Sequence, residues 1–348
     1  MKRAAVSSPA KQKPRAAQSP RRGMRDLGAV YKGASVVVTG GLGFIGSNLA
    51  IRLAELGAQV TIVDSLLPGF GGNIFNIAPV EGQVRVNISD VRDSHSLTAL
   101  LPGQKFLFNL AAQVSHVGSM TDPLVDLDIN VRSQLLLLEA CRQHNPTIRI
   151  VHVSSRHVYG RAQYLPVDEA HPLAPMDIYS INKLAGEQYY RLYGAVHKLR
   201  VSVLRLTNVY GPRQNALDFI GVFLRRAVAR QPLLIYGDGS QIRDYTYIDD
   251  VCRAMLMMGA SDETLGEVFN LGGAEHCSVS NFAQRLSALA HTSVQYVPYP
   301  PERAAIEIGD FHADDTKFRL ATGWSPRVKL DEGLKATYDY FNDNQDRY

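Results

Sequence analysis

The sequence predicts an α/β protein built around a doubly wound parallel sheet, with a smaller, interleaved α/β lobe toward the C-terminus. Three observations support this fold class. Short β-branched runs alternate with stretches that carry apolar residues at helical spacing. A glycine-rich turn joins the first run to the first helical stretch. The chain has 348 residues, 45% of them hydrophobic, which is enough for about two ordinary domains.

The predicted elements follow one another in a regular order. The first strand is expected at 35–39, because three consecutive valines suit a strand that is buried on both faces. A helix follows at 44–56, where leucines and isoleucine recur at helical spacing and Gly57 ends the run. The same reasoning predicts buried strands at 59–63, 84–88, 105–110, 148–154 and 200–206, and helices at 123–141 and 178–197.

The pattern becomes less regular after about residue 208, where glycine and proline pairs separate shorter elements. Helices are predicted there at 219–230, 278–290 and 331–341. A further helix at 249–258 and a strand at 267–271 are expected to return to the first lobe. The predicted division is therefore 33–208 with 245–272 for the first lobe, and 209–244 with 273–348 for the second.

The positive charge of the chain is concentrated at its N-terminus. Residues 1–32 hold nine of the 37 Lys and Arg and one of the 33 Asp and Glu, which leaves 28 basic and 32 acidic residues in the rest. This segment is rich in Pro, Ser, Ala and Gln, so we expect a disordered basic tail. A weak arm for an anionic partner and a translation start at Met24 are the alternatives. The remaining body is acidic, so no nucleic-acid partner is expected.

Several classes of protein are excluded by what the sequence lacks. No apolar run reaches the roughly 18–20 residues that span a bilayer, and residues 1–32 lack the apolar segment of a secretory signal, so no membrane partner is expected. The three cysteines have no metal-ligand spacing, so no metal site is expected. An odd, scattered cysteine count fits a cytoplasmic protein.

The glycine turn Gly40–Gly46 predicts a dinucleotide site. It follows a buried strand and opens a helix, and its glycines allow the backbone to approach a pyrophosphate at the helix N-terminus. The next strand ends at Asp64, whose carboxylate can bind an adenosine ribose and repels a 2′-phosphate. Ser65 and Leu66 follow it instead of an arginine, so NAD is favoured over NADP as the cofactor.

Tyr179 and Lys183 form a candidate catalytic pair. They lie four residues apart on the helix at 178–197, so both side chains share one face. The lysine ammonium is expected to lower the pKa of the phenol toward neutrality, which would make Tyr179 a general base. Ser154 and Ser155 end the strand at 148–154, at the edge of the sheet where ligands bind. We therefore expect serine, tyrosine and lysine in one crevice.

Ordered motifs extend this constellation over most of the chain: TGGLGFIGS (39–47), Asp64, Asp90-Val91, NLAAQ (109–113), SSRHVYG (154–160), YSINK (179–183), LRLTNVYGPR (204–213), YGDGSQIRDYTYIDDV (236–251) and FNLGG (269–273). With these motifs, the chain from about Ala34 onward resembles the extended short-chain dehydrogenase/reductase superfamily. Within it, the resemblance is to the nucleotide-sugar epimerase/dehydratase branch, which includes UDP-glucose and UDP-glucuronate 4-epimerases. A Rossmann-type NAD domain at 33–208 is therefore implied.

The resemblance implies a role for each matching residue. The implied catalytic residues are Ser155, Tyr179 and Lys183. The implied cofactor contacts are Gly40, Gly43, Phe44, Ile45, Gly46, Asp64, Asp90, Val91, Ala111, Ala112, Gln113, Tyr179 and Lys183. The implied substrate contacts are Ser155, Asn208 at the sugar or diphosphate, Tyr236 stacked on the nucleobase, and Arg243 and Arg303 as diphosphate clamps. Arg156 does not match the family pattern and is a further candidate substrate contact.

One departure from the family pattern concerns the residues after Ser155. The similar 4,6-dehydratases have Asp-Glu there, and UDP-glucuronate decarboxylases have a Glu before Val-Tyr-Gly, whereas this chain has Arg156 and His157. Dehydration needs an acid–base group for the C5 proton and the C6 hydroxyl, and arginine cannot supply it. We expect His157 to be a packed or hydrogen-bonded structural residue, and acid–base work by its imidazole near pH 7 is the alternative. Arg156 is a solvated or structural charge, or a partner for a sugar carboxylate.

The sequence therefore predicts an NAD-dependent nucleotide-sugar epimerase that acts at C4 of a UDP-hexose or UDP-hexuronate through a 4-keto intermediate. The alternatives are a 4,6-dehydratase, a UDP-glucuronate decarboxylase or a C2-epimerase on the same scaffold, and a non-catalytic NAD-binding regulator. The resemblance also implies a homodimer that forms through the helices at 123–141 and 178–197.

Overall fold

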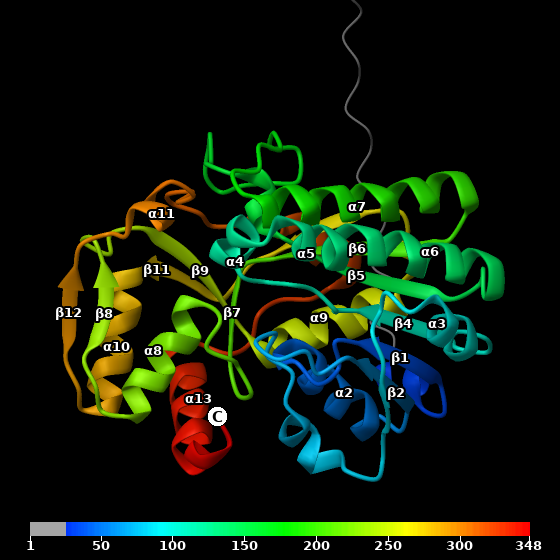
Figure 1. Cartoon of the computed structure of the whole chain (residues 1–348), viewed down its shortest axis with the longest axis horizontal. Helices are drawn as coiled ribbons and strands as arrows, with labels where there is room; N and C mark the ends of the chain where they lie inside the picture. Colours follow the sequence, from blue (N-terminus) through cyan, green and yellow to red (C-terminus); the bar gives the residue numbers. More distant parts are fainter. Residues whose placement is uncertain (1–25) are drawn as a thin grey trace, which may run out of the picture.

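The computed structural model describes residues 26–348, and its centre is a seven-stranded sheet in the order β10-β6-β5-β4-β1-β2-β3 (Figure 1). Every neighbouring pair in this sheet is parallel. The predicted doubly wound α/β class is confirmed. The strands are β1 (Ser35–Thr39), β2 (Gln59–Asp64), β3 (Arg85–Ile88), β4 (Phe106–Asn109), β5 (Arg149–Ser155), β6 (Arg200–Leu206) and β10 (Val268–Leu271).

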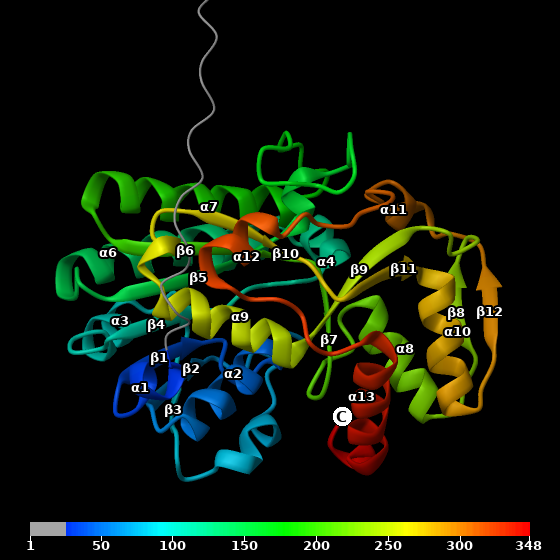
Figure 2. The ribbon, with the colours of Figure 1, turned by 180° about the vertical axis from the view of Figure 1, so that it is seen from behind.

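Helices cover both faces of this sheet (Figures 1 and 2). Side chains alternate across a strand, so Val36 and Val38 of β1 join one hydrophobic cluster while Val37 joins another. Helices α2 (Phe44–Glu55) and α9 (Ile248–Ala260) pack on the first side. Helices α6 (Ser133–His144) and α7 (Ile178–His197) pack on the second. Both faces of β1 are therefore buried, as the valine run predicted.

The second lobe contains two small sheets and three longer helices. One sheet has the order β11-β9-β7 and the other pairs β12 with β8. A single hydrophobic cluster includes Leu49 of the first lobe together with Phe282 and Leu334 of the second, so the two lobes share one core. The elements are β7 (Asn208–Tyr210), β8 (Leu233–Tyr236), β9 (Ile242–Tyr247), β11 (Glu275–Ser278), β12 (Val294–Val297), α8 (Phe219–Val228), α10 (Val279–Ala290) and α13 (Leu330–Asp343).

The chain enters the first lobe a further time near its C-terminal end. Helix α12 (Thr316–Thr322) places Phe318 against Phe269 of β10, with ring centroids 5.4 Å apart. Trp324 donates its indole N–H to the carbonyl of Asp250 at 3.0 Å. The sequence assigned this segment to the second lobe. The assignment could not be read from periodicity, because it depends on which distant surface Phe318 and Trp324 cover.

The predicted basic tail is wrong for its last residues. Residues 1–25 lie outside the described part of the chain, but α1 (Leu27–Tyr31) is a helix capped by Asp26. Tyr31 is 0% exposed, and its hydroxyl donates to the Leu256 carbonyl at 2.8 Å. Burying one aromatic ring favours an ordered helix although the flanking composition is polar and basic.

Two other predicted elements also differ from the structure. The strand predicted as buried at 84–88 is β3, the last strand of the sheet, where Val86 and Ile88 are 37% and 55% exposed. The single helix predicted at 123–141 consists of α5 (Pro123–Leu127), the π-helical turn η2 (Asp128–Arg132) and α6. The remaining elements are α3 (Ser94–Leu100), α4 (His116–Thr121), α11 (Pro301–Ala304), η1 (Ile74–Val80), η3 (Arg156–Tyr159), η4 (Asp262–Thr264) and η5 (Gln345–Arg347).

None of the helices in residues 26–348 is both long enough and apolar enough to cross a lipid bilayer.

Candidate functional site

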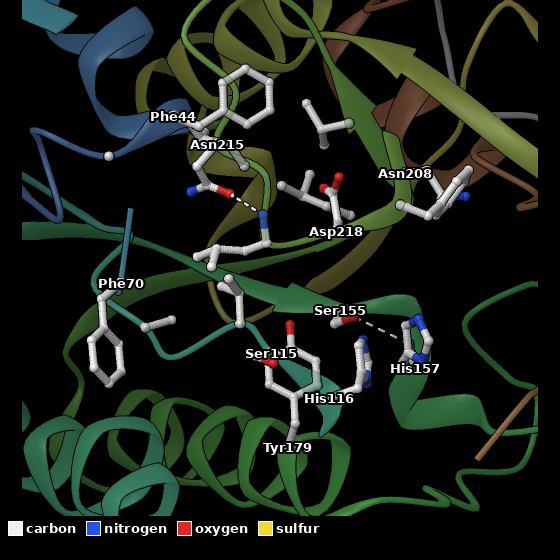
Figure 3. A pocket seen from close by; sticks show the side chains of 18 of the residues that line it. Phe44, Phe70, Ser115, His116, Ser155, His157, Tyr179, Asn208, Asn215 and Asp218 are labelled. Atoms are coloured by element: carbon white, nitrogen blue, oxygen red, sulfur yellow. Dashed lines mark hydrogen bonds between the residues drawn. The ribbon is translucent and has the colours of Figure 1, made fainter. Parts of the chain in front are cut away.

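A cavity of about 700 Å³ lies between the two lobes, at the carboxyl ends of the central strands. Its volume is in the range of small-molecule sites. Figure 3 shows Ser155, His157, Tyr179 and His116 together on one side of it, with Phe44 and Asn215 further along. Every predicted site residue except Gln113 lines this cavity.

The glycine turn forms one end of the cavity. Gly40 has φ +65°, and a Cβ placed on Gly46 would lie only 2.1 Å from the Gly40 oxygen, so the turn and α2 pack at a distance that only glycine permits. The N-cap of α2 is Gly43, which offers no side chain to the first amides of the helix. These amides and the helix dipole can therefore bind a pyrophosphate.

Asp64 is fixed at the carboxyl end of β2. Its two oxygens accept backbone amides from Leu42 and Leu66, each at 3.0 Å, so the carboxylate is held toward the cavity. Each oxygen retains lone pairs that can accept a ribose hydroxyl. With the glycine turn, this carboxylate fits the adenosine and pyrophosphate of a dinucleotide.

Asp90 and Val91 continue the wall on the same side. Asp90 forms an ion pair with Arg92 at 2.7 Å, and the hydrogen bond from Arg92 lowers the pKa of this carboxyl. Ala111 and Ala112 also line the cavity.

Gln113 differs from its neighbours in the same motif. Its amide nitrogen donates to the carbonyl of Ser115 at 2.9 Å, and its amide oxygen accepts the backbone N–H of Ser115. Asn130 of η2 also donates to the Gln113 carbonyl at 3.0 Å. In this structure, Gln113 shapes the loop that precedes α4 and does not line the cavity.

Tyr179 and Lys183 lie one turn apart at the start of α7, which begins after the capping residue Asp177. Tyr179 is 7% exposed, and its hydroxyl points toward Ser155 (Figure 3). The Lys183 ammonium donates to the carbonyl of Val153 at 2.6 Å. Ser155 ends β5, where its hydroxyl oxygen accepts the backbone N–H of His157 at 3.2 Å. The structure thus brings together the three predicted catalytic residues.

The pKa of Tyr179 differs from the sequence-based expectation. Burial raises the pKa of this phenol to about 12, although a hydrogen bond with Ser155 acts in the opposite direction. Burial also lowers the pKa of Lys183 to about 8. The expected drop toward neutrality is absent because the desolvation of Tyr179 outweighs its favourable neighbours.

His116 is a site residue that the sequence analysis did not identify. Its Nδ1 lies 2.5 Å from an oxygen of Asp177, and its ring lies 4.5 Å from the Tyr179 ring and 4.0 Å from the His157 ring. The only signal in the sequence was its position three residues after the NLAAQ motif.

His157 packs against His116, as expected of a structural histidine. Burial, with added repulsion from nearby cations, holds the pKa of His157 well below its usual value, so the ring is neutral near pH 7. His116, His157 and Asp177 place ligand atoms within 4.8 Å of one another, a spacing that can hold a metal ion, although no metal was expected from the sequence.

Arg156, Asn208 and Arg243 line the other end of the cavity. Arg156 is 4% exposed, and it donates to the Asn208 amide oxygen at 3.3 Å. Arg243 is already engaged, because it donates to the carbonyls of Ile242 and Gly309 and pairs with Glu307.

Tyr236 and Arg303 form the outer part of this end. The Arg303 guanidinium lies 5.5 Å from the centroid of the Tyr236 ring, and Tyr236 is 36% exposed. Several cavity residues in this lobe were not predicted, since neither their spacing nor their residue type indicated a ligand: Asn215, Leu217, Asp218, Phe219, Val222, Leu234, Gln241, Tyr299 and Glu307.

The chain is similar in sequence and in structure to known proteins. The family model described as "NAD dependent epimerase/dehydratase family" matches residues 36–272. The chain is 33% identical to the UDP-glucose 4-epimerase of Mycolicibacterium smegmatis over 88% of this chain and 97% of the relative. It is 30% identical to a dTDP-glucose 4,6-dehydratase of Streptomyces niveus over 89% of this chain and 93% of the relative. The solved structure of an epimerase from Methanothermobacter thermautotrophicus is similar with a TM-score of 0.86, at 30% identity, over 92% of this chain and 95% of that chain.

Proposed function

We propose that this chain, which belongs to the NAD-dependent epimerase/dehydratase family, inverts the C4 hydroxyl of a UDP-linked sugar by way of a 4-keto form. One observation carries the proposal. Ser155, Tyr179 and Lys183 meet in the cavity, while the residues that follow Ser155 are Arg156 and a neutral His157. The site thus has the groups that move a proton at C4 but lacks, at the two positions after Ser155, the carboxyl groups that similar 4,6-dehydratases have there.

The acidic residues that line the cavity support this distinction. Asp64 and Asp90 lie at the dinucleotide end, and Glu307 pairs with Arg243. The fourth, Asp218, caps α8 through the Gly221 amide and accepts the Gln214 side chain on both oxygens. Each of the four is committed elsewhere, so none is available as the dehydratase acid.

The roles of the three catalytic residues follow from their positions. The Tyr179 oxygen takes the proton of the C4 hydroxyl and later returns one, while the Ser155 hydroxyl holds the C4 oxygen by a hydrogen bond. Lys183 is charged below about pH 8 and stabilises the phenolate while it also binds the nicotinamide ribose. The chemistry that NAD supplies when bound is reversible hydride transfer at C4.

The binding residues are proposed from the same geometry. The turn at Gly40, Gly43 and Gly46 holds the pyrophosphate, and Asp64 holds the adenosine ribose. At the other end, Tyr236 stacks on the nucleobase, and Arg303 binds the diphosphate.

Product analysis with deuterium at C4 of the substrate tests the reaction. An epimerase returns the label to C4 with inverted configuration, whereas a 4,6-dehydratase moves it to C6 and gives a product lighter by water. A product lighter by CO₂ would indicate a decarboxylase, and inversion at C2 would indicate a C2-epimerase. No turnover of any sugar in a panel of UDP-, dTDP-, CDP- and GDP-sugars, together with NAD binding, would favour a non-catalytic regulator.

We also propose a homodimer that forms through α5 and α7. Apolar side chains are exposed along these helices, among them Leu124 at 72%, Leu192 at 52% and Val196 at 60%. A second copy of the same surface would bury them in a symmetric helical interface. Leu192→Glu should convert the dimer to a monomer in analytical ultracentrifugation, whereas Leu320→Glu on α12, 81% exposed, should not. A wild-type monomer would contradict the proposal.

We propose a cytoplasmic location because Cys141, Cys252 and Cys277 are all free. Disulfides persist mainly in oxidising compartments, and reducing compartments preserve free thiols. Fractionation of cells that express the protein tests this, and recovery in a membrane or secreted fraction would contradict it.

A further inference from the structure

Arg156 is a buried cation without an acidic partner. It is 4% exposed, and among the described residues no carboxylate forms an ion pair with it. Its Nη2 donates to the Asn208 amide, its Nη1 is buried without a hydrogen-bond partner, and its guanidinium lies 5.2 Å from the Phe311 ring centroid. Buried arginines are normally paired, since an uncompensated charge is costly to remove from water.

Other buried arginines of this protein show the usual arrangement. Arg205 is 3% exposed and binds both carboxylate oxygens of Glu187. Arg149 is 6% exposed and pairs with Asp262 at 2.9 Å. Among the buried arginines of residues 26–348, Arg156 is the one without a carboxylate partner, and it lines the cavity, so the missing anion is expected from a ligand.

The charged groups around Arg156 are already bound by other residues. Its neighbour Arg243 is also a cation, and Glu307 is already bound by Arg243 and Tyr299. Burial raises the pKa of Asp244 to about 6, and its oxygens accept the backbone amides of Gly273 and Ala313. Burial, with added repulsion from Arg243, lowers the pKa of Arg156 to about 9, although Glu307 and Asp244 act in the opposite direction. An anionic ligand group would relieve both costs.

The position of Arg156 indicates which ligand group this is. It follows Ser155 directly, and its positive charge is close enough to Tyr179 to act against the rise in the pKa of that phenol. The proposed function places the C4 oxygen of the sugar at Ser155 and Tyr179. In a hexopyranose, C6 is attached to C5, next to C4, while the diphosphate is attached to C1 across the ring. A cation beside the C4 site is therefore closer to C6 than to the diphosphate.

We infer that Arg156 binds a carboxylate at C6 of the sugar, so that the substrate is a nucleotide hexuronate. The inference rests on the proposed reaction at C4, because that reaction orients the ring. The planar guanidinium fork matches a carboxylate and can bind both of its oxygens. A neutral hexose carries a hydroxymethyl group there and leaves the buried charge uncompensated, so the site discriminates against it.

Calorimetry on the NAD-bound wild-type protein gives the first test. UDP-glucuronate and UDP-glucose have the same configuration and differ only at C6, and UDP alone reports the nucleotide and diphosphate. We expect UDP-glucuronate to bind roughly 10- to 100-fold more tightly than UDP-glucose, as for a hydrogen-bonded charge pair. Equal affinity, or tighter binding of UDP-glucose, would overturn the inference.

Variants of Arg156 separate the carboxylate from the diphosphate. Arg156→Gln should weaken the binding of UDP-glucuronate at least about tenfold more than the binding of UDP. Arg156→Lys should recover part of the lost affinity for UDP-glucuronate, because lysine keeps the positive charge. An equal loss of affinity for UDP-glucuronate, UDP-glucose and UDP would indicate that Arg156 binds the diphosphate, which would contradict the inference. The melting temperature and NAD affinity of each variant identify a folding defect, in which case the wild-type comparison decides.

The two proposals can fail separately. Selective binding of UDP-glucuronate without formation of UDP-galacturonate would retain the carboxylate site and reject epimerisation at C4. Interconversion of UDP-glucose and UDP-galactose at a higher kcat/KM than that of the uronates would retain epimerisation and reject the carboxylate site.

Discussion

The two ends of the cavity are built in opposite ways. At the dinucleotide end, the glycine turn, α2 and Asp64 belong to one continuous β-α-β unit from β1 to β2. At the sugar end, Ser155, Asn208 and Arg303 come from distant parts of the chain and from both lobes. The residues of the first end are close together in the sequence, whereas those of the second end meet only when the two lobes pack on their shared core. Binding of NAD and of the nucleotide sugar should therefore respond separately to mutation.

The largest effect is expected where the two ends meet. Tyr179→Phe removes the proton-accepting oxygen and keeps the ring, so kcat should fall by roughly 10²- to 10⁴-fold while the affinities for NAD and UDP stay close to wild type. Steady-state kinetics and calorimetry measure the two readouts. Tyr189→Phe on the same helix is the control and should retain activity. Unchanged turnover in Tyr179→Phe would show that another group is the base.

Lys183→Met tests the electrostatic support of that base. A neighbouring positive charge lowers the pKa of an acid by about 1–3 units, so turnover near pH 7 should drop about 10- to 10³-fold. Because the pKa of Lys183 is about 8, the ammonium is present below that pH and is lost above it. Its removal should move the acidic limb of the pH–kcat profile upward, toward the raised pKa of Tyr179. A loss of activity with an unmoved profile would indicate a role in ribose binding alone.

Asp64→Asn sharpens the contrast between the two ends. The substitution keeps an oxygen for one of the two amides, those of Leu42 and Leu66, but replaces the second oxygen by a donor and removes the charge that supports bonds to a ribose. NAD affinity should fall about 10- to 100-fold while UDP affinity is unchanged. Asp93→Asn, at an exposed helix cap outside the cavity, is the matched control. If the affinities for NAD and UDP fell together, binding at the two ends of the cavity would be coupled.

The smallest effect concerns α1, which belongs to neither end. Tyr31→Phe removes the hydrogen bond to the buried Leu256 carbonyl and should lower the free energy of unfolding by about 1 kcal/mol, without a change in NAD or UDP affinity. Urea denaturation measures this free energy of unfolding. Tyr164→Phe, which loses an exposed bond to Asp168, should stay within about 0.5 kcal/mol of wild type. Equal stability of wild type and Tyr31→Phe would show that α1 contributes little.

Local sequence patterns were enough to predict the first lobe and its candidate catalytic pair. The valine run of β1, the glycine turn and the Tyr179–Lys183 spacing each act within one element or between adjacent ones, so local periodicity was sufficient to predict them. The same local signal misjudged β3, because whether a strand is central or at an edge depends on what pairs with it.

Features that depend on contacts between distant segments became visible only in the three-dimensional structure. In the structure, Tyr31 is hydrogen-bonded to α9 and His116 packs beside Tyr179. Glu307 pairs with Arg243, and Arg156 has no carboxylate partner among the described residues. Burial also raises the pKa of Tyr179, an effect that four-residue spacing cannot reveal. The physical reason is common to all of them. Desolvation and charge compensation are set by every group that packs around a side chain, and those groups come from segments far apart in the sequence.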